Sequence, residues 1–166
     1  MNRRVIKVGG SLLDLPDLPQ RIQNWLKTIE PCQNILLMGG GNFCNELRVL
    51  HQRYNLSEST SHELCMHQMV VTSRLLAELM QLEIANTIDS IESSDHDLVF
   101  DCRRWLAGRH SVPKTWDVTS DSIGALLAAE LQCELYLLKS VDTKEVDEFF
   151  PVAAKDVCRV SFVNLR

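Results

Sequence analysis

The chain has 166 residues, is 45% hydrophobic and 23% charged, and carries a formal net charge of −5 at pH 7. This length and composition suit one globular domain, residues 1–166, and exclude an intrinsically disordered chain. The sequence has no basic cluster, which argues against a nucleic-acid partner, and no apolar run long enough for a signal peptide or a membrane span. We therefore expect a cytoplasmic protein that has no membrane partner.

The first predicted element is a buried strand over residues 5–8, an apolar run that ends in the glycine turn at 9–11. An amphipathic helix follows over about 19–29, and Pro31 ends it. A second apolar strand covers residues 35–38. The start of the chain therefore alternates strand, helix and strand.

A second glycine turn, residues 39–41, follows the second strand, and a helix is expected to begin at Asn42. Thr60 and Glu63 have the spacing of a capping box, which predicts the start of a long helix that runs to about Leu82. This helix has more apolar residues than one sheet face needs. It is either core or a dimer seam.

The remaining predicted strands cover residues 98–100, 135–138 and 159–163, and Thr119 or Ser120 is expected to cap a helix over 121–131. Strands that alternate with helices are typical of a mainly parallel sheet covered on both faces. We therefore predict an α/β fold, a three-layer αβα sandwich with a mainly parallel sheet.

Both glycine turns follow a predicted strand, and ligands of parallel α/β sheets bind at the carboxyl ends of the strands. Consecutive glycines let the backbone approach an anion and turn its N–H groups toward it, and the helix from Asn42 would add its N-terminal dipole. Turns without a ligand are the alternative. Neither cluster matches GxxxxGK[ST] or GxGxxG, which argues against a P-loop or dinucleotide-binding protein.

Four charged residues near the predicted strand ends are candidates for chemistry. Lys7 lies in an otherwise apolar strand, where an ammonium is costly unless it reaches an anion or the sheet edge. Asp121 begins a helix, where it can cap the helix or orient lysines around a phosphate. Lys139 could be one of those lysines, and Asp142 could face a nucleotide or a metal.

The six cysteines and five histidines are scattered along the chain. No two cysteines form a CxxC pair, and a disulfide framework is not expected without a secretion signal. Cys65 lies between His62 and His67, but these histidines do not share a helix face as an HExxH pair does. We expect no metal held by side chains.

Four segments, in chain order, resemble the amino acid kinase family: KVGGS at 7–11, GGGN at 39–42, TSDSIGALLA at 119–128 and LKSVD at 138–142. The resemblance implies an amino acid kinase-like fold and an enzyme that uses ATP and Mg²⁺ to phosphorylate a small molecule. It also implies a homodimer. Such a reaction depends mainly on positioning and electrostatics.

By this resemblance, Lys7 would stabilise the transferring phosphoryl group and Asp121 would organise the charges around it. The nucleotide would be bound by Gly9, Gly10, Ser11, Lys139 and Asp142. The acceptor would be bound by Gly39, Gly40, Gly41 and Asn42.

Within the family, VDEFFP at 146–151 and the LKSVD segment look closest to a small branch similar to a methanofuran-pathway kinase, which phosphorylates an aminomethyl-furan-methanol phosphate. The expected acceptor is thus small and phosphorylated or carboxylated. Larger family members carry a further lysine-containing glycine segment, whereas the last glycine here is Gly124. We expect a compact fold shortened at its C-terminus. The alternative function is a non-catalytic phosphometabolite-binding or subunit protein.

Overall fold

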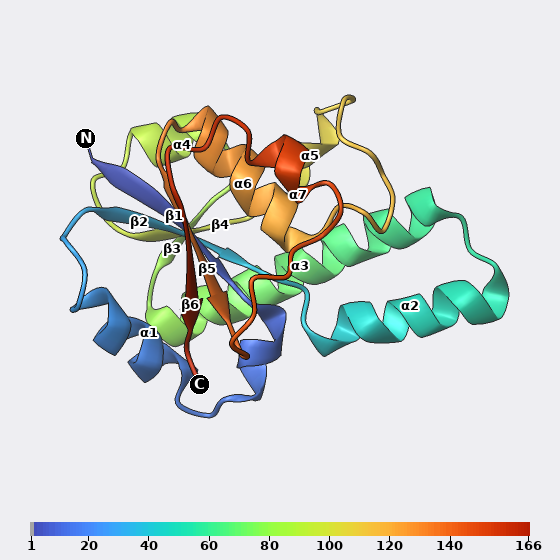
Figure 1. The fold of residues 1–166 in the computed structure, drawn as a ribbon, viewed down its shortest axis with the longest axis horizontal. Coiled ribbons are helices and arrows are strands. Elements are labelled where there is room, and N and C mark those ends of the chain that lie inside the picture. Colours follow the sequence, from blue (N-terminus) through green and yellow to red (C-terminus); the bar gives the residue numbers. More distant parts are fainter. Residues whose placement is uncertain (1) are drawn as a thin grey trace.

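The computed structural model describes residues 2–166 and shows a six-stranded sheet in the order β3-β4-β2-β1-β5-β6 (Figure 1). The strands are β1 (Arg3–Val8), β2 (Gln33–Met38), β3 (Glu83–Ala85), β4 (Leu98–Phe100), β5 (Glu134–Lys139) and β6 (Val160–Asn164). Every strand pair is parallel, so the predicted α/β class is confirmed. The five predicted strands are all present. The edge strand β3 was not predicted, because it has three residues and two of them are exposed.

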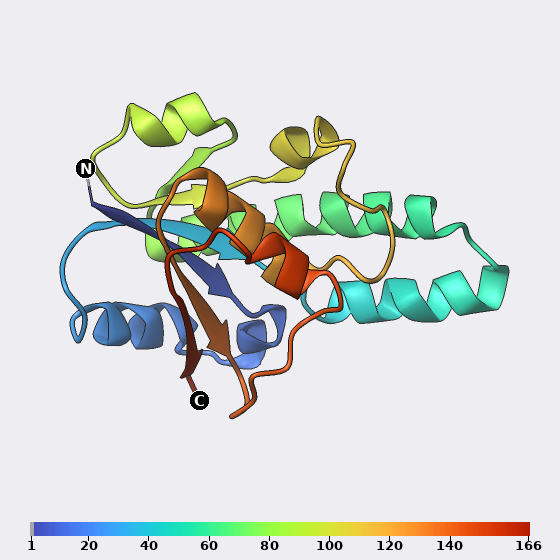
Figure 2. The same cartoon turned by 45° about the horizontal axis from the view of Figure 1, so that its top comes forward.

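Helices cover both faces of the sheet. They are the 3-10 helix η1 (Gly10–Asp14), α1 (Leu18–Leu26), α2 (Asn42–Tyr54), α3 (Glu58–Met80), α4 (Ile88–Glu92), α5 (Arg103–Ala107), α6 (Ser120–Glu130) and α7 (Phe150–Ala153). Figures 1 and 2 show α6 and α7 on one side of the sheet and α1 on the other. Successive side chains of β1 point to opposite faces of the sheet and pack in two different helical layers. Val5 packs in the core with α6, whereas Ile6 and Val8 pack with α1.

Helices α2 and α3 lie side by side and reach beyond the sheet, whereas the later part of α3, with Leu76 and Ala77, packs against the sheet (Figure 2). The long helix was predicted correctly, but its predicted cap was wrong. Ser57 caps α3 by accepting a hydrogen bond from the Thr60 N–H, so the helix begins at Glu58, ahead of the predicted box. No helix in residues 2–166 is long and apolar enough to cross a membrane.

The sequence after Asp142 predicts only a tail that ends in a strand, and the structure corrects this expectation. Helix α7 buries Phe150 and Ala153 in the same core as α6, and β6 pairs with β5 at the sheet edge. The last part of the chain therefore holds both the sheet and the layer that carries Asp121.

Candidate active site

The two glycine turns touch each other at the carboxyl end of the sheet. Because β1 and β2 are neighbours in register, Gly10 and Gly41 meet, and a Cβ on Gly10 would lie 2.1 Å from the Gly41 nitrogen. A Cβ on Gly39 would lie 2.9 Å from both the Gly10 nitrogen and the Ser120 hydroxyl oxygen. No side chain fits between these backbones. The glycines therefore bring two strand ends and the start of α6 together.

The N-terminus of α2 opens onto this meeting point without a side-chain cap. Gly41 is its N-cap residue, with φ at +67°, a left-handed conformation that glycine adopts without strain. The first N–H groups of a helix have no partner within the helix, and the helix dipole makes this end positive. The glycine turns and α2 together form a surface suited to an anion.

Lys7 and Lys139 are joined through Asp121, whose neighbour Ser120 lies against Gly39 of the second glycine turn. The Lys7 Nζ atom lies 2.7 Å from Asp121 Oδ1, in an ion-pair contact whose geometry is not that of a directed hydrogen bond. The Lys139 ammonium donates to Asp121 Oδ2 at 2.5 Å and to the Glu145 carbonyl oxygen at 3.0 Å. One carboxylate is thus shared by two ammoniums.

Burial and pairing shift the pKa values of this cluster. Burial lowers the pKa of Lys7, and the nearby Asp121 carboxylate only partly offsets that effect. For Asp121, burial acts to raise the pKa, but the Lys7 and Lys139 ammoniums together outweigh it and lower the pKa. Asp121 is therefore ionised at neutral pH and available to orient both lysines.

Asp147 is a residue of this site that the sequence did not reveal. Its carboxylate accepts hydrogen bonds from the Thr119 and Ser122 N–H groups, each at 3.1 Å, and from the hydroxyl groups of the same two residues. Thr119 also caps α6, as predicted, by accepting from the Asp121 N–H. Asp147 thus satisfies the N-terminus of the helix that carries Asp121, and it holds that carboxylate in place from a distant segment.

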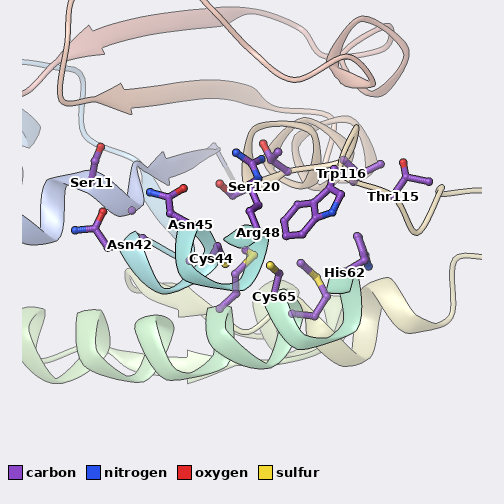
Figure 3. Close-up of a pocket in the computed structure, with 18 residues that line it drawn as sticks. Ser11, Asn42, Cys44, Asn45, Arg48, His62, Cys65, Thr115, Trp116 and Ser120 are labelled. Atoms are coloured by element: carbon purple, nitrogen blue, oxygen red, sulfur yellow. The ribbon is translucent and has the colours of Figure 1, made fainter. Parts of the chain in front are cut away.

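The glycine turns line a cavity of about 240 Å³, which we call the glycine cavity. Figure 3 shows Ser11 and Asn42 at one end of it and His62 and Thr115 at the other. The Arg48 guanidinium lies over the Trp116 ring, 4.9 Å from its centroid, and both residues line the cavity. The remaining wall contains thiols and thioethers, from Cys44, Cys65, Met66 and Met69. The cavity therefore combines polar ends with an apolar wall.

The other predicted site residues lie around this cavity to different extents. Gly10, Ser11, Gly39, Gly40, Gly41 and Asn42 line it. The Ser11 and Ser140 hydroxyl oxygens are 2.7 Å apart, and this contact joins the turns after β1 and β5. Gly9 donates its N–H to the Leu138 carbonyl oxygen. Asp142 is exposed beyond β5 and does not line the cavity. Its nucleotide contact remains a prediction.

Comparisons with known proteins agree with this architecture. Residues 2–144 match the amino acid kinase family. The chain is 25% identical over 146 residues to (5-(aminomethyl)furan-3-yl)methyl phosphate kinase from Methanocaldococcus jannaschii. The matched region covers 86% of this chain and 62% of that protein. The chain thus spans less than two thirds of the length of this relative.

Two solved structures share the fold. Uridylate kinase from Archaeoglobus fulgidus matches with a TM-score of 0.59 at 18% identity, over 86% of this chain and 64% of that one. Aspartate kinase from Synechocystis matches with a TM-score of 0.57 at 15% identity, over 83% of this chain and 28% of that one. At these identities the likeness is one of fold, and it confirms the architecture expected from the sequence.

Proposed function

Because the chain belongs to the amino acid kinase family, we propose that it transfers the γ-phosphoryl group of ATP to a small phosphorylated or carboxylated acceptor. The observation that carries this proposal is the pair of lysines held by Asp121 at the start of α6, where Ser120 lies against two touching glycine turns. Phosphoryl transfer needs positive charge fixed where negative charge spreads over the transferred group. This cluster supplies a fixed positive charge from buried side chains.

Each residue of the cluster has a distinct part in the proposed reaction. Lys7 would stabilise the transferring group, because its ammonium has three donors and Asp121 is the one carboxylate with which it forms an ion pair in residues 2–166. Asp121 would hold the two ammoniums apart and aligned. Lys139, with the turn of Gly9, Gly10 and Ser11, would bind the nucleotide phosphates. Asn42 and the turn of Gly39, Gly40 and Gly41 would bind the acceptor's anionic group.

Mg²⁺ fits this site as a companion of the nucleotide. Asp121 is committed to two ammoniums, and residues 2–166 contain no group of three or more ligating side chains that could hold a metal ion. We propose that Mg²⁺ arrives on the phosphates of ATP, where it supplies charge neutralisation. An ATP-dependent enzyme of this kind would act in the cytoplasm.

The first acceptor to assay is (5-(aminomethyl)furan-3-yl)methyl phosphate, because the M. jannaschii relative is named for it. A phosphate acceptor suits this site, since its oxygen is already anionic and needs no strong general base. The apolar cavity wall of Met66 and Met69 would face a small ring.

The alternative is a protein that binds a phosphorylated metabolite without transferring a phosphoryl group, alone or as a subunit. It would use the same glycine turns and the open N-terminus of α2. The feature that favours it is that residues 125–166 contain no glycine, so this segment offers no glycine turn for a nucleotide.

Calorimetric titration with ADP and a non-hydrolysable ATP analogue, with and without Mg²⁺, separates these two proposals. A kinase is expected to bind nucleotide in the micromolar range and to bind it more tightly with Mg²⁺. Phosphorus NMR of ATP with the furan phosphate then tests transfer directly. An absence of heat at millimolar nucleotide would refute the kinase proposal and favour metabolite binding.

We also propose that the outer face of α2 and α3 binds a second copy of this chain. Of the 11 exposed large hydrophobic residues in residues 2–166, eight lie on these two helices. Val71, Leu75 and Leu79 are between 44 and 57% exposed and lie one helical turn apart along α3. A two-fold dimer pairs the same patch on both subunits, and an apolar patch is complementary to itself.

Light scattering with size-exclusion chromatography tests the dimer. The wild type is expected to have the mass of two chains, and Val71→Asp to have the mass of one, because the dimer would bury two opposed carboxylates. Val152→Asp, at an equally exposed residue on α7, is the matched control and should leave the mass unchanged. A monomeric wild type would refute this part of the proposal.

A further inference from the structure

A second cavity, of about 170 Å³, adjoins the glycine cavity at its far end. It lies between the first half of α3, helix α5 and the loop at 109–114. His62 and Met66 line both cavities, so the two spaces share a wall. In Figure 3 His62 is at the end of the glycine cavity remote from Ser11. A molecule held at the glycine turns would therefore point its other end toward this second cavity.

The second cavity is basic, although the chain as a whole has a net charge of −5. Its walls include Arg103, Arg109 and Lys114, against the single carboxylate of Glu63. Arg109 is already committed, because it pairs with Glu130 and lies over the Trp105 ring at 4.2 Å. Arg103 and Lys114 are exposed and pair with no carboxylate within 4.0 Å in residues 2–166. Two cations are thus available to a ligand.

His62 provides the independent sign of a ligand. The residue is only 7% exposed, and its Nε2 atom is buried with no hydrogen-bond partner among the described residues. A buried polar nitrogen without a partner costs about 1–3 kcal/mol, so native proteins rarely leave one unpaired. Burial and the nearby charge of Lys114 lower the pKa of His62, so the imidazole is neutral at pH 7. With its proton on Nε2, it would donate one hydrogen bond.

We propose that the second cavity is a distal anion subsite, in which His62 and Lys114 bind a carboxylate or phosphate at the far end of the acceptor. Arg103 adds a second positive charge at the rim. This inference rests on the proposed function, because it identifies the acceptor as a molecule with an anionic group at each end. It therefore predicts that the furan phosphate named for the M. jannaschii relative, whose far end is an ammonium group, binds less tightly here than an acceptor with a second anionic group, since that ammonium would meet two unpaired cations.

The subsite can be tested without nucleotide or turnover. The probe is inorganic phosphate, titrated at constant ionic strength while the His62 Nε2 resonance is followed by ¹⁵N NMR. We expect a saturable shift in the wild type, and the same shift in Lys7→Met, because Lys7 lines neither cavity. Lys114→Ala should weaken phosphate binding at His62 at least about tenfold, because a charge-assisted contact is lost. Lys155→Ala, at an exposed lysine elsewhere, is the control.

Two ligands of equal length, one a dicarboxylate and the other a monocarboxylate, then test whether one molecule spans both cavities. Glutarate is expected to bind at least about tenfold more tightly than pentanoate, and Lys114→Ala should remove that advantage. A His62 resonance unmoved by millimolar phosphate, or unchanged affinity in Lys114→Ala, would overturn the subsite. Equal affinities for the two acids would overturn the two-ended acceptor. Failure of the nucleotide titration would instead refute the kinase proposal and leave these measurements standing.

Discussion

Strand β1 buries one cation near each end, and the two are held in different ways. Arg4, near the amino end, is 5% exposed, and Lys7, near the carboxyl end, is 6% exposed. Arg4 donates to the Cys32 sulfur at 2.8 Å and to the Glu30 carbonyl oxygen, and it lies 5.7 Å from the Tyr136 ring centroid. These partners are neutral, so the arginine is satisfied by groups that belong to the fold.

Lys7 has an acidic partner that it shares with Lys139, and it lies two residues before a glycine turn. Its ammonium has three donors, and Asp121 is its one acidic partner within 4.0 Å among the described residues. The comparison teaches that burial of a cation does not by itself indicate function. What distinguishes Lys7 is an acidic partner shared with a second lysine, beside a surface where backbone N–H groups can hold an anion.

The largest expected effect concerns Lys7, the cation at the carboxyl end of β1. Lys7→Met should reduce phosphoryl transfer about a thousandfold, because it removes a preorganised charge from the transferring group. Stability should change little, since Lys139 continues to neutralise Asp121. Initial rates and thermal unfolding measure the two quantities. Transfer at the wild-type rate in this variant would show that Lys7, like Arg4, is structural.

The second prediction concerns the shared carboxylate. Asp121→Asn should lower the free energy of unfolding by about 3 kcal/mol, because two mostly buried ammoniums would lose their counter-ion. Chemical denaturation measures this change. Asp142→Asn is the matched control, because this carboxylate is exposed and follows the same strand. Its effect should stay within about 0.5 kcal/mol. A loss of similar size in both variants would contradict the bridging role.

The third prediction addresses the structural cation. Arg4→Met should lower the free energy of unfolding by about 2 kcal/mol, because the Glu30 carbonyl oxygen and the Cys32 thiol lose their donor. The rate of phosphoryl transfer should not change, since Arg4 lies at the opposite end of the strand from the glycine turns. If Arg4→Met slowed phosphoryl transfer without changing the free energy of unfolding, the distinction between a structural Arg4 and a functional Lys7 would be wrong.

The smallest effect is the acid dependence of stability. The pKa of Asp121 is lower in the folded chain than its value of about 3.9 in an unfolded one, so its stabilising contribution is fully present above pH 4. That contribution is lost as the pH falls through the lowered value, because the unfolded chain then binds the extra proton first. The stability difference between wild type and Asp121→Asn should therefore narrow below about pH 4. A constant difference down to pH 2 would contradict the pKa shift.

The sequence by itself determined the fold class and the position of the glycine turns. The apolar runs at 5–8, 35–38 and 135–138 predict strands, and all three lie in strands of the sheet. Glycines directly after the first two runs mark where those strands end. Parallel strands place their carboxyl ends at one edge, so Lys7 and the glycines could be assigned to one region. Short sequence segments were sufficient to predict these strands and turns, because each of them is formed by neighbouring residues.

Only the tertiary structure decided which distant groups meet. Asp147 caps α6 from a loop 25 residues beyond Ser122, and no local pattern marks it as a capping residue. His62, Arg103 and Lys114 come from a long helix, a five-residue helix and a loop, and each alone reads as an ordinary polar residue. The edge strand β3 gains its pairing from β4 rather than from its own sequence. Long-range hydrogen bonds and charges depend on which elements pack together, and that information is not contained in any single segment.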